Sequence, residues 1–235
     1  MRACVVGYGA MGKILCQELG NELAGVVALE CDNKSLFDVK EEFDVIIDFS
    51  NPANLDMIID YATKNKKPVV FATTGFSEND YVKINDLSKI VPVLVSSNFS
   101  LGVILLNKLV KEITPILKDD FDIEIIEAHH HNKVDAPSGT AKMLLKSVCD
   151  ASGFSPVYGR NGYAPRNPNE VGVHAVRGGS IVGNHDVIFA GNDEVITLSH
   201  SAGSKKIFAV GAIKAARFLI KKDIGLYDRE DVLFN

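Results

Sequence analysis

A glycine motif at the start of the chain limits what its first hundred residues can fold into. In "VVGYGAMGK", Gly7, Gly9 and Gly12 keep the spacing G-x-G-x-x-G, after the apolar run "ACVVG" and before a helical pattern. Gly7 permits a tight turn, Gly9 lets backbone approach a pyrophosphate, and Gly12 lets a helix pack closely on the strand. The free N–H groups at the helix N-terminus would face the phosphates. We predict a dinucleotide-binding βαβ unit; the alternative is a glycine-rich turn without a ligand.

Short apolar runs alternate with helical patterns along the first hundred residues, as they do in a parallel sheet with helices on both faces. Five runs are typical of strands: "ACVVG", "LAGVVALE", "FDVIIDFS", "KPVVFATTG" and "VPVLVSSNF". Between the third and fourth, Asn51 can cap a helix whose first position is Pro52. We therefore predict an α/β protein whose residues 1–100 form a Rossmann-like domain.

Small and polar residues stand where the predicted strands end. Ligands of an open parallel sheet bind outside the carboxyl ends of its strands, so we expect these residues to lie along one crevice. They are Gly7, Phe49-Ser50, Thr73-Thr74-Gly75 and Ser96-Ser97-Asn98. Taken alone, the threonine pair also fits an ordinary polar loop.

The second predicted strand ends at Glu30, where a carboxylate can accept hydrogen bonds from ribose hydroxyls. A 2′-phosphate would be repelled there and would require a neighbouring arginine. Cys31 and Asp32 follow instead, with only Lys34 in reach. We expect NADH to be favoured over NADPH.

The pattern changes after Ser100. A long helical stretch over residues 101–117 precedes the strand "FDIEIIEA", a motif rich in histidine, and a helix around residues 141–145. A long loop, "GFSPVYGRNGYAPRNPNEVG", is predicted to be a lid or substrate loop. The runs "VGVHAVRGG", "SIVGNHDVIFAG" and "EVITLSH" are spaced like a meander. We predict a smaller mixed α+β domain over residues 101–206, with residues 207–235 returning to the first domain.

Composition limits the partners and the compartment. The net charge of -5 provides no basic face for nucleic acid. The four cysteines are scattered without metal-site or disulfide spacing, and no apolar run approaches the length of a membrane span. We expect a globular cytoplasmic protein that binds neither nucleic acid nor membrane.

The motif over residues 127–141, "EAHHHNKVDAPSGTA", places proton-transfer and anion-binding groups together. Histidine can give or take a proton near neutral pH, and Lys133 adds a positive charge. The helix start at Ser138-Gly139-Thr140 offers N–H groups to an anion. These residue types predict a site for an anionic small molecule that must be protonated.

Two other interpretations of the histidines remain open. A metal site is disfavoured because side chains on an extended backbone alternate, so that His129, His130 and His131 cannot converge on one ion. We expect no metal. A structural cluster, in which the imidazoles merely bond backbone groups, is the second alternative.

The segment "IEIIEAHHHNKVDAPSGTA" closely resembles the signature of the dihydrodipicolinate reductase family, also called 4-hydroxy-tetrahydrodipicolinate reductases. The resemblance extends over nearly the whole chain, through "VVGYGAMG", "IDFS", "FATTGF", "SSNFSLGV", "VRGGSIVGNHDVIFAG" and "FAVGAIKAAR". It implies NAD(P)H-dependent reduction of a cyclic dicarboxylic imine, or of its hydroxylated precursor, in lysine and diaminopimelate biosynthesis. It also implies a homotetramer whose contacts come from the second domain.

The resemblance implies a role for each matching residue. His129 would be the proton donor and acceptor, and Lys133 would act beside the ring nitrogen. His130 would contact the substrate, while Gly139 and Thr140 would bind a substrate carboxylate. The implied cofactor residues are Gly7, Tyr8, Gly9, Ala10, Met11, Gly12, Glu30, Ala72, Thr73, Thr74, Ser96, Ser97, Asn98 and Phe99.

His131, Asn132 and Lys205 depart from the family pattern, which puts fine substrate affinity in doubt. Two alternative functions remain: a dinucleotide-sensing homologue without catalysis, or a reductase of another imino acid. Because substrate and hydride must meet, we also predict closure about hinges near Ser100 and Lys206.

Overall fold

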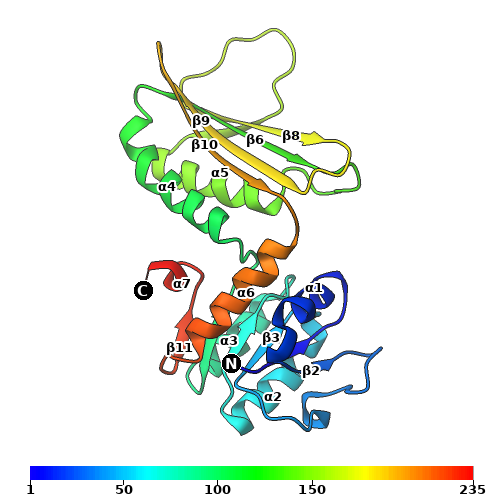
Figure 1. The fold of residues 1–235 in the computed structure, drawn as a ribbon. Coiled ribbons are helices and arrows are strands. Elements are labelled where there is room, and N and C mark those ends of the chain that lie inside the picture. Colours follow the sequence, from blue (N-terminus) through cyan, green and yellow to red (C-terminus); the bar gives the residue numbers. More distant parts are fainter. Residues whose placement is uncertain (235) are drawn as a thin grey trace. The chain divides into compact units, whose positions relative to one another are not determined.

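The computed structural model describes residues 1–234 and divides into two compact units (Figure 1). The first unit contains Met1–Leu101 and the chain from Lys206 onward, and the second contains Gly102–Lys205. Both connections between the units therefore lie beside the predicted boundaries and hinges. Closure about those hinges stays a prediction.

The first unit is built on a six-stranded sheet. Its strands are β1 (Ala3–Val6), β2 (Leu23–Val27), β3 (Val45–Asp48), β4 (Val69–Phe71), β5 (Pro92–Val95) and β11 (Gly225–Tyr227). They lie in the order β11-β5-β4-β3-β1-β2, and every neighbouring pair is parallel. The prediction of a Rossmann-like parallel sheet is confirmed, and β11 brings the C-terminal tail back to this unit.

Helices cover both faces of this sheet. The helices α1 (Ala10–Leu19) and α6 (Lys206–Leu219) share one apolar cluster with Ala3 and Val5 of β1. On the other face, α2 (Leu55–Asn65) and α3 (Glu78–Leu87) pack with Cys4 and Val6. Successive residues of a strand point to opposite faces, so β1 is buried along its whole length.

Local signals explain where two of these helices begin. The side chain of Asn51 accepts from the amide of Ala53, as predicted, and a short 3₁₀ turn, Pro52–Asn54, precedes α2. The sequence analysis did not identify α3. It begins with a capping box in which the Ser77 hydroxyl and the Asp80 carboxylate satisfy each other's amides.

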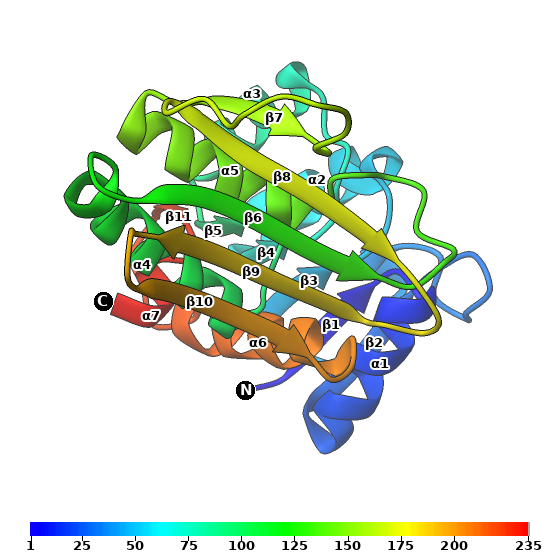
Figure 2. The ribbon, with the colours of Figure 1, turned by 90° about the horizontal axis from the view of Figure 1, so that it is seen from above.

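The second unit holds a five-stranded mixed sheet covered on one face by α4 (Leu101–Leu117) and α5 (Gly139–Ser152) (Figures 1 and 2). Its strands are β6 (Asp122–His129), β7 (Ser155–Tyr158), β8 (Glu170–Arg177), β9 (Gly183–Ala190) and β10 (Val195–Ala202). The order is β10-β9-β6-β8-β7. This arrangement confirms the predicted mixed α+β architecture.

Two expectations about this unit were wrong. The three later strands do not form a meander, because β6 lies between β8 and β9 and pairs parallel with one and antiparallel with the other. Periodicity identifies strands but carries no information about their partners. The predicted loop is also not a loop throughout, since Ser155–Tyr158 forms the edge strand β7.

Within residues 1–234, no helix is both long and apolar enough to cross a lipid bilayer.

Candidate functional site

The glycine motif lies where a dinucleotide pyrophosphate would require it. Gly7 follows β1 with φ +99°, and a Cβ there would lie 2.4 Å from the carbonyl oxygen of Phe49. A Cβ on Gly12 would lie 2.2 Å from the carbonyl oxygen of Gly7. At Gly9, by contrast, no atom of residues 1–234 outside Gly9 and its two chain neighbours lies within 4 Å of the Cβ position.

The start of α1 adds anion-binding character. Gly9 is its N-cap residue, and no side chain of the described chain caps its first turn. The first amides of a helix have no intrahelical acceptor, and the helix dipole favours negative charge there. The open space at Gly9 and these amides fit a bound pyrophosphate. Tyr8, Ala10 and Met11 lie on the same turn.

The carboxyl ends of β3, β4 and β5 enclose a cavity of about 310 Å³ in the first unit. Its lining contains most of the predicted nicotinamide-end residues, together with Phe208 of α6, which the sequence analysis missed. The lining residues are Met11, Phe49, Ser50, Ala72, Thr73, Thr74, Ser97, Phe99 and Phe208. The predicted crevice is therefore present, while the roles of its residues stay predictions.

Ser96 and Asn98 hold the chain rather than line this cavity. The Ser96 hydroxyl donates to the carbonyl of Asn98 at 2.7 Å, and Asn98 Oδ1 accepts from the amide of Ser100 at 2.8 Å. These bonds shape the turn from β5 into α4. Only Ser97 of the predicted pair Ser96-Ser97 reaches the cavity described above.

A buried carboxylate supports the same edge of the sheet. Asp48, 1 % exposed, accepts from the amide of Ser50 at 3.1 Å, and this amide also donates to Oγ1 of Thr73 at 2.8 Å. Burial raises the pKa of Asp48 to about 6, against the opposing effect of hydrogen bonds from Ser50 and Thr73. The network ties the end of β3 to the end of β4.

The loop after β2 presents Glu30 to solvent. Lys34, the one base considered for a 2′-phosphate, donates through Nζ to the carbonyl oxygens of Leu29 and Cys31. Its ammonium group therefore holds the loop. This use of Lys34 could not be read from its position in the sequence.

In the second unit, His129 stands at the end of β6 and is nearly buried. Its Nδ1 lies 2.6 Å from Oε2 of Glu127, whose side chain is fully buried. The Glu127 carboxylate also accepts from Nη1 and Nη2 of Arg177, at 2.8 and 2.7 Å, and from the amide of Ser138 at 3.0 Å. One carboxylate thus joins β6, β8 and the start of α5.

The charge of this cluster follows from its hydrogen bonds. Burial opposes ionisation of Glu127, yet the bonds from Arg177, His129 and the Ser138 amide together hold its pKa below the usual value. An ionised carboxylate can only accept, so Nδ1 of His129 carries a proton. The Nε2 atom is then the nitrogen left to exchange a proton with a ligand.

His185 of β9 packs edge-on against His129, with ring centroids 5.2 Å apart. Burial, and to a smaller extent the neighbouring His129, lowers the pKa of His185 to about 4, so that its ring is neutral. Its Nε2 lies 3.0 Å from Oγ of Ser138, the N-cap residue of α5. His185 therefore supports the helix start.

The remaining predicted residues lie on the turn from β6 to α5. Lys133 places Nζ 2.7 Å from Oδ1 of Asp135, and this bond, more than any other cause, lowers the pKa of Asp135. His130 is half-buried, whereas His131 is exposed. The strand β6 ends at His129, and His130 and His131 stand in the turn segment that follows, so the three histidines differ in environment without all lying on an extended backbone.

The helix α5 begins at Gly139, after Ser138 accepts the amide of Ala141 on its hydroxyl at 3.2 Å. Gly139 and Thr140 lie in its first turn. Apart from its chain neighbours and the backbone of its own helix, no atom of residues 1–234 lies within 4 Å of a Cβ built on Gly139, which leaves room for a ligand at the helix N-terminus. The geometry fits a bound carboxylate.

Four polar residues of this site were not singled out from the sequence: Glu127, Asp135, Arg177 and His185. Glu127 had a readable signal, because it is in phase with Ile123 and Ile125 on the buried face of β6. A carboxylate on a core face requires partners. Arg177 had no such signal, because it is 50 residues from Glu127 in sequence.

Two family models match the chain. The model described as "Dihydrodipicolinate reductase, N-terminus" matches residues 1–99, and the model for the C-terminus of the same family matches residues 102–233. The chain belongs to the dihydrodipicolinate reductase family. Membership covers both units and accounts for the motif over residues 127–141.

Individual members of the dihydrodipicolinate reductase family are similar over most of their length. The 4-hydroxy-tetrahydrodipicolinate reductase of Brachyspira hyodysenteriae is 46% identical over 235 residues, covering 99% of this chain and 100% of the relative. That of Exiguobacterium sibiricum is 46% identical over 242 residues, covering 98% and 95%. That of Caldanaerobacter subterraneus is 51% identical over 201 residues, covering 84% and 80%.

Solved structures show the same fold. A dipicolinate-bound dihydrodipicolinate reductase from Paenisporosarcina sp. TG-14 superposes with a TM-score of 0.78 at 20% identity, covering 97% of each chain. A probable dehydrogenase from Thermotoga maritima superposes with a TM-score of 0.57. The dinucleotide-binding fold and the reductase family together imply the use of NAD(P)H.

Proposed function

We propose that this protein reduces 4-hydroxy-tetrahydrodipicolinate to tetrahydrodipicolinate with NAD(P)H, in lysine and diaminopimelate biosynthesis. The observation that carries the proposal is a histidine, His129, held with one nitrogen on a buried carboxylate, beside a helix start suited to an anion. Relatives that bear the name of this reductase and are matched over nearly their whole length support it.

The proposed reaction gives His129 and Lys133 of the second unit separate roles. Loss of the 4-hydroxyl as water leaves an unsaturated ring, and one hydride and one proton then saturate one bond of it. A bound reduced nicotinamide supplies the hydride. Nε2 of His129, once it has taken up a proton from solvent to give the imidazolium, would deliver that proton, and Lys133 would stabilise charge beside the ring nitrogen.

Substrate orientation would come from the first turn of α5. The amides of Gly139 and Thr140 would hold one carboxylate of the cyclic dicarboxylate, and His130 would contact the same molecule. The fully buried Glu127 binds the amide of Ser138, so the anion site and the acid share one support.

Glu30, Cys31 and Asp32 favour NADH over NADPH. The carboxylate of Glu30 would accept from the ribose hydroxyls and repel a 2′-phosphate. Lys34 does not offset this repulsion, because its ammonium bonds the carbonyls of Leu29 and Cys31.

A homotetramer is the proposed assembly. Within the second unit, 102–205, the helices cover one face of the sheet and leave the other open (Figure 2). Partly exposed apolar residues lie on its strands, among them Val176, Ile188 and Val195. The mass of the protein in solution, from light scattering after size exclusion, tests this assembly. The cytoplasm is the proposed compartment, since all four cysteines are free thiols in the described chain.

The direct test is the loss of reduced-nicotinamide absorbance by the purified protein, with NADH and NADPH in parallel. Substrate is made in situ from pyruvate and aspartate semialdehyde by the preceding synthase. Rapid oxidation is expected, faster with NADH. Absence of oxidation with intact nucleotide binding would instead indicate a silent dinucleotide sensor or a reductase of another imino acid.

A further inference from the structure

The strand β6 carries two glutamates that each pair with one histidine and one arginine. Glu124 binds Arg166 and His174, while Glu127 binds Arg177 and His129. The two glutamates point to opposite faces of the sheet, because they are an odd number of residues apart. Glu124 and Glu127 therefore have different environments, which indicate different roles.

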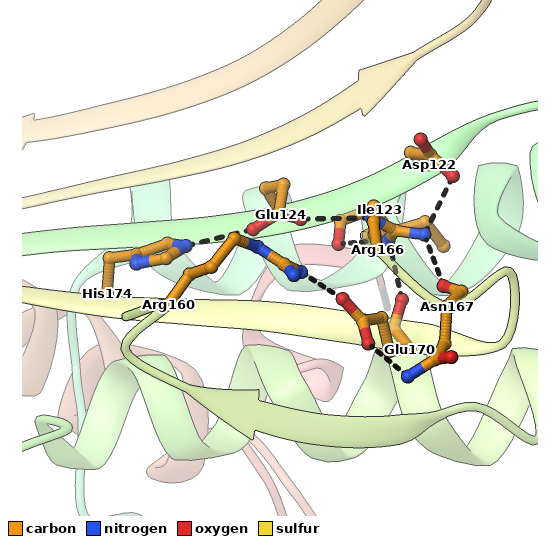
Figure 3. Close-up of polar contacts among 8 residues, drawn as sticks. All are labelled: Asp122, Ile123, Glu124, Arg160, Arg166, Asn167, Glu170 and His174. Carbon is orange, nitrogen blue, oxygen red and sulfur yellow. Dashed lines mark hydrogen bonds and ion pairs between the residues drawn. The ribbon is translucent and has the colours of Figure 1, made fainter. Parts of the chain in front are cut away.

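Glu124 belongs to a network that holds the chain after β7 (Figure 3). Its side chain is 23% exposed and lies 2.9 Å from Nε2 of His174 and 3.2 Å from Nε of Arg166. Arg166 also bonds the carbonyls of Ile123 and Glu170. The two side chains that bind Glu124 are partly exposed, and Arg166 ties the loop before β8 to β6, which indicates a structural role.

Glu127 faces the core instead. Its side chain is fully buried, and each of its oxygens accepts at least two hydrogen bonds. Oε2 accepts from Nδ1 of His129 and Nη1 of Arg177, and Oε1 accepts from Nη2 of Arg177 and the amide of Ser138. Arg177 balances its charge, so the carboxylate is ionised without proton uptake.

This arrangement leaves His129 one orientation. With Nδ1 protonated and bound to Glu127, the ring cannot flip without breaking a 2.6 Å hydrogen bond to a buried charge. Neutral imidazole in free solution exchanges between two tautomers. Only the Nδ1–H tautomer leaves Nε2 free to take up a proton from solvent and then deliver it to the substrate. We propose that Glu127 is a positioning residue, which keeps His129 in the Nδ1–H tautomer with Nε2 toward substrate and links it to the first turn of α5.

The inference rests on the proposed function for its catalytic consequence, although the tautomer itself can be measured without turnover. The probe is ¹⁵N-labelled histidine, with the His129 signal assigned by its loss in the His129→Gln variant. Spectra are taken at about pH 9, above the ordinary histidine pKa of roughly 6.5. The unsubstituted protein is expected to show Nδ1 protonated and Nε2 unprotonated.

In Glu127→Gln, we expect mixed tautomers of His129 and a loss of kcat on the order of 100-fold, the lower end of what acid catalysis supplies. Affinity for NADH should stay unchanged, because the glycine motif and Glu30 lie in the other unit. The matched control is Glu124→Gln, because Glu124 lies on the same strand as Glu127 and its carboxylate also binds one histidine and one arginine. This variant should leave the His129 spectrum unchanged and kcat within about twofold of the original.

A pure Nδ1–H tautomer in Glu127→Gln, or a kcat within about threefold of the original, would overturn the inference. Should that variant fail to fold, Glu127→Gln/Arg177→Met removes both charges together and carries the same expectation and the same counter-result. If the unsubstituted protein does not oxidise NADH, the proposed function fails, and the tautomer measurement still decides the positioning role.

Discussion

Gly183 of β9 lies directly against Nε2 of His129, the nitrogen that faces away from Glu127. A Cβ on Gly183 would stand 2.9 Å from Nε2, closer than a methyl group can approach an imidazole nitrogen without displacement. The glycine thus leaves space beside Nε2, from which a ligand could approach the ring nitrogen. Its role could not be inferred from a lone glycine in a strand.

Gly183→Ala is expected to lower kcat by about 10- to 100-fold, since a displacement of about 1 Å in a catalytic group has effects of that order. NADH affinity should be unchanged, and steady-state kinetics with titration of NADH fluorescence would show both. Gly178→Ala is the control, because in the described chain no atom outside Gly178 and its two chain neighbours lies within 4 Å of its Cβ position. Equal kcat values for the two variants would contradict this role of Gly183.

His129→Gln should abolish most turnover while nucleotide binding persists. Glutamine can donate a hydrogen bond but cannot supply a proton at the required rate, and loss of a general acid lowers kcat by about 10²- to 10⁴-fold. The same absorbance assay measures the loss. Unchanged turnover would refute the assignment of the acid.

Glu30→Gln should weaken the preference for NADH. Hydrogen bonds to a charged group contribute about 1.5–3 kcal/mol, so the KM for NADH should rise about tenfold, while NADPH becomes a better substrate. Asp32→Asn removes the same charge two residues later and should change the ratio of the two cofactors less. A larger change in Asp32→Asn would identify Asp32 as the discriminating residue.

The raised pKa of Asp48 predicts that the stability of the protein depends on pH. Its folded pKa of about 6 is above the ordinary value near 3.8, so the folded protein binds more protons than the unfolded chain between these values. The greater proton affinity of Asp48 in the folded protein stabilises it fully below about pH 4, and this stabilisation is lost as pH rises through about 6. The shift corresponds to about 3 kcal/mol.

Urea denaturation of the original protein and of Asp48→Asn, at several pH values between 4 and 8, isolates the contribution of Asp48. The free energy of unfolding of the original protein should fall relative to that of the variant as pH rises. Parallel pH profiles would show that Asp48 titrates normally.

Arg166→Gln should release the chain between β7 and β8. Arg166 binds Asp122 at 2.7 Å, Glu124 at 3.2 Å and the carbonyl of Glu170 at 2.6 Å. We expect a loss of about 2 kcal/mol in stability and faster chymotrypsin cleavage at the exposed Tyr163. Lys146→Gln, which removes an exposed pair with Asp150, is the control and should change neither.

Local patterns in the sequence predicted the architecture of both units. The glycine spacing, the apolar runs and the cap at Asn51 each act over a few residues, so they are legible without a structure. The motif over residues 127–141 likewise predicted a site formed by a histidine, a lysine and a helix start, which the structure places on β6, on the turn after it and at the start of α5. The capping box at Ser77 and Asp80 was equally legible and was missed.

Tertiary structure alone decided which distant groups meet. The insertion of β6 between β8 and β9 brings Arg177 and Gly183 to His129, and strand pairing depends on free-energy differences that no local pattern encodes. The same holds for Lys34, whose ammonium could reach a phosphate or a carbonyl until the loop conformation selected Leu29 and Cys31. The sequence determined the chemical groups, and the fold determined their partners, because contacts over long sequence separations form only when the whole chain packs.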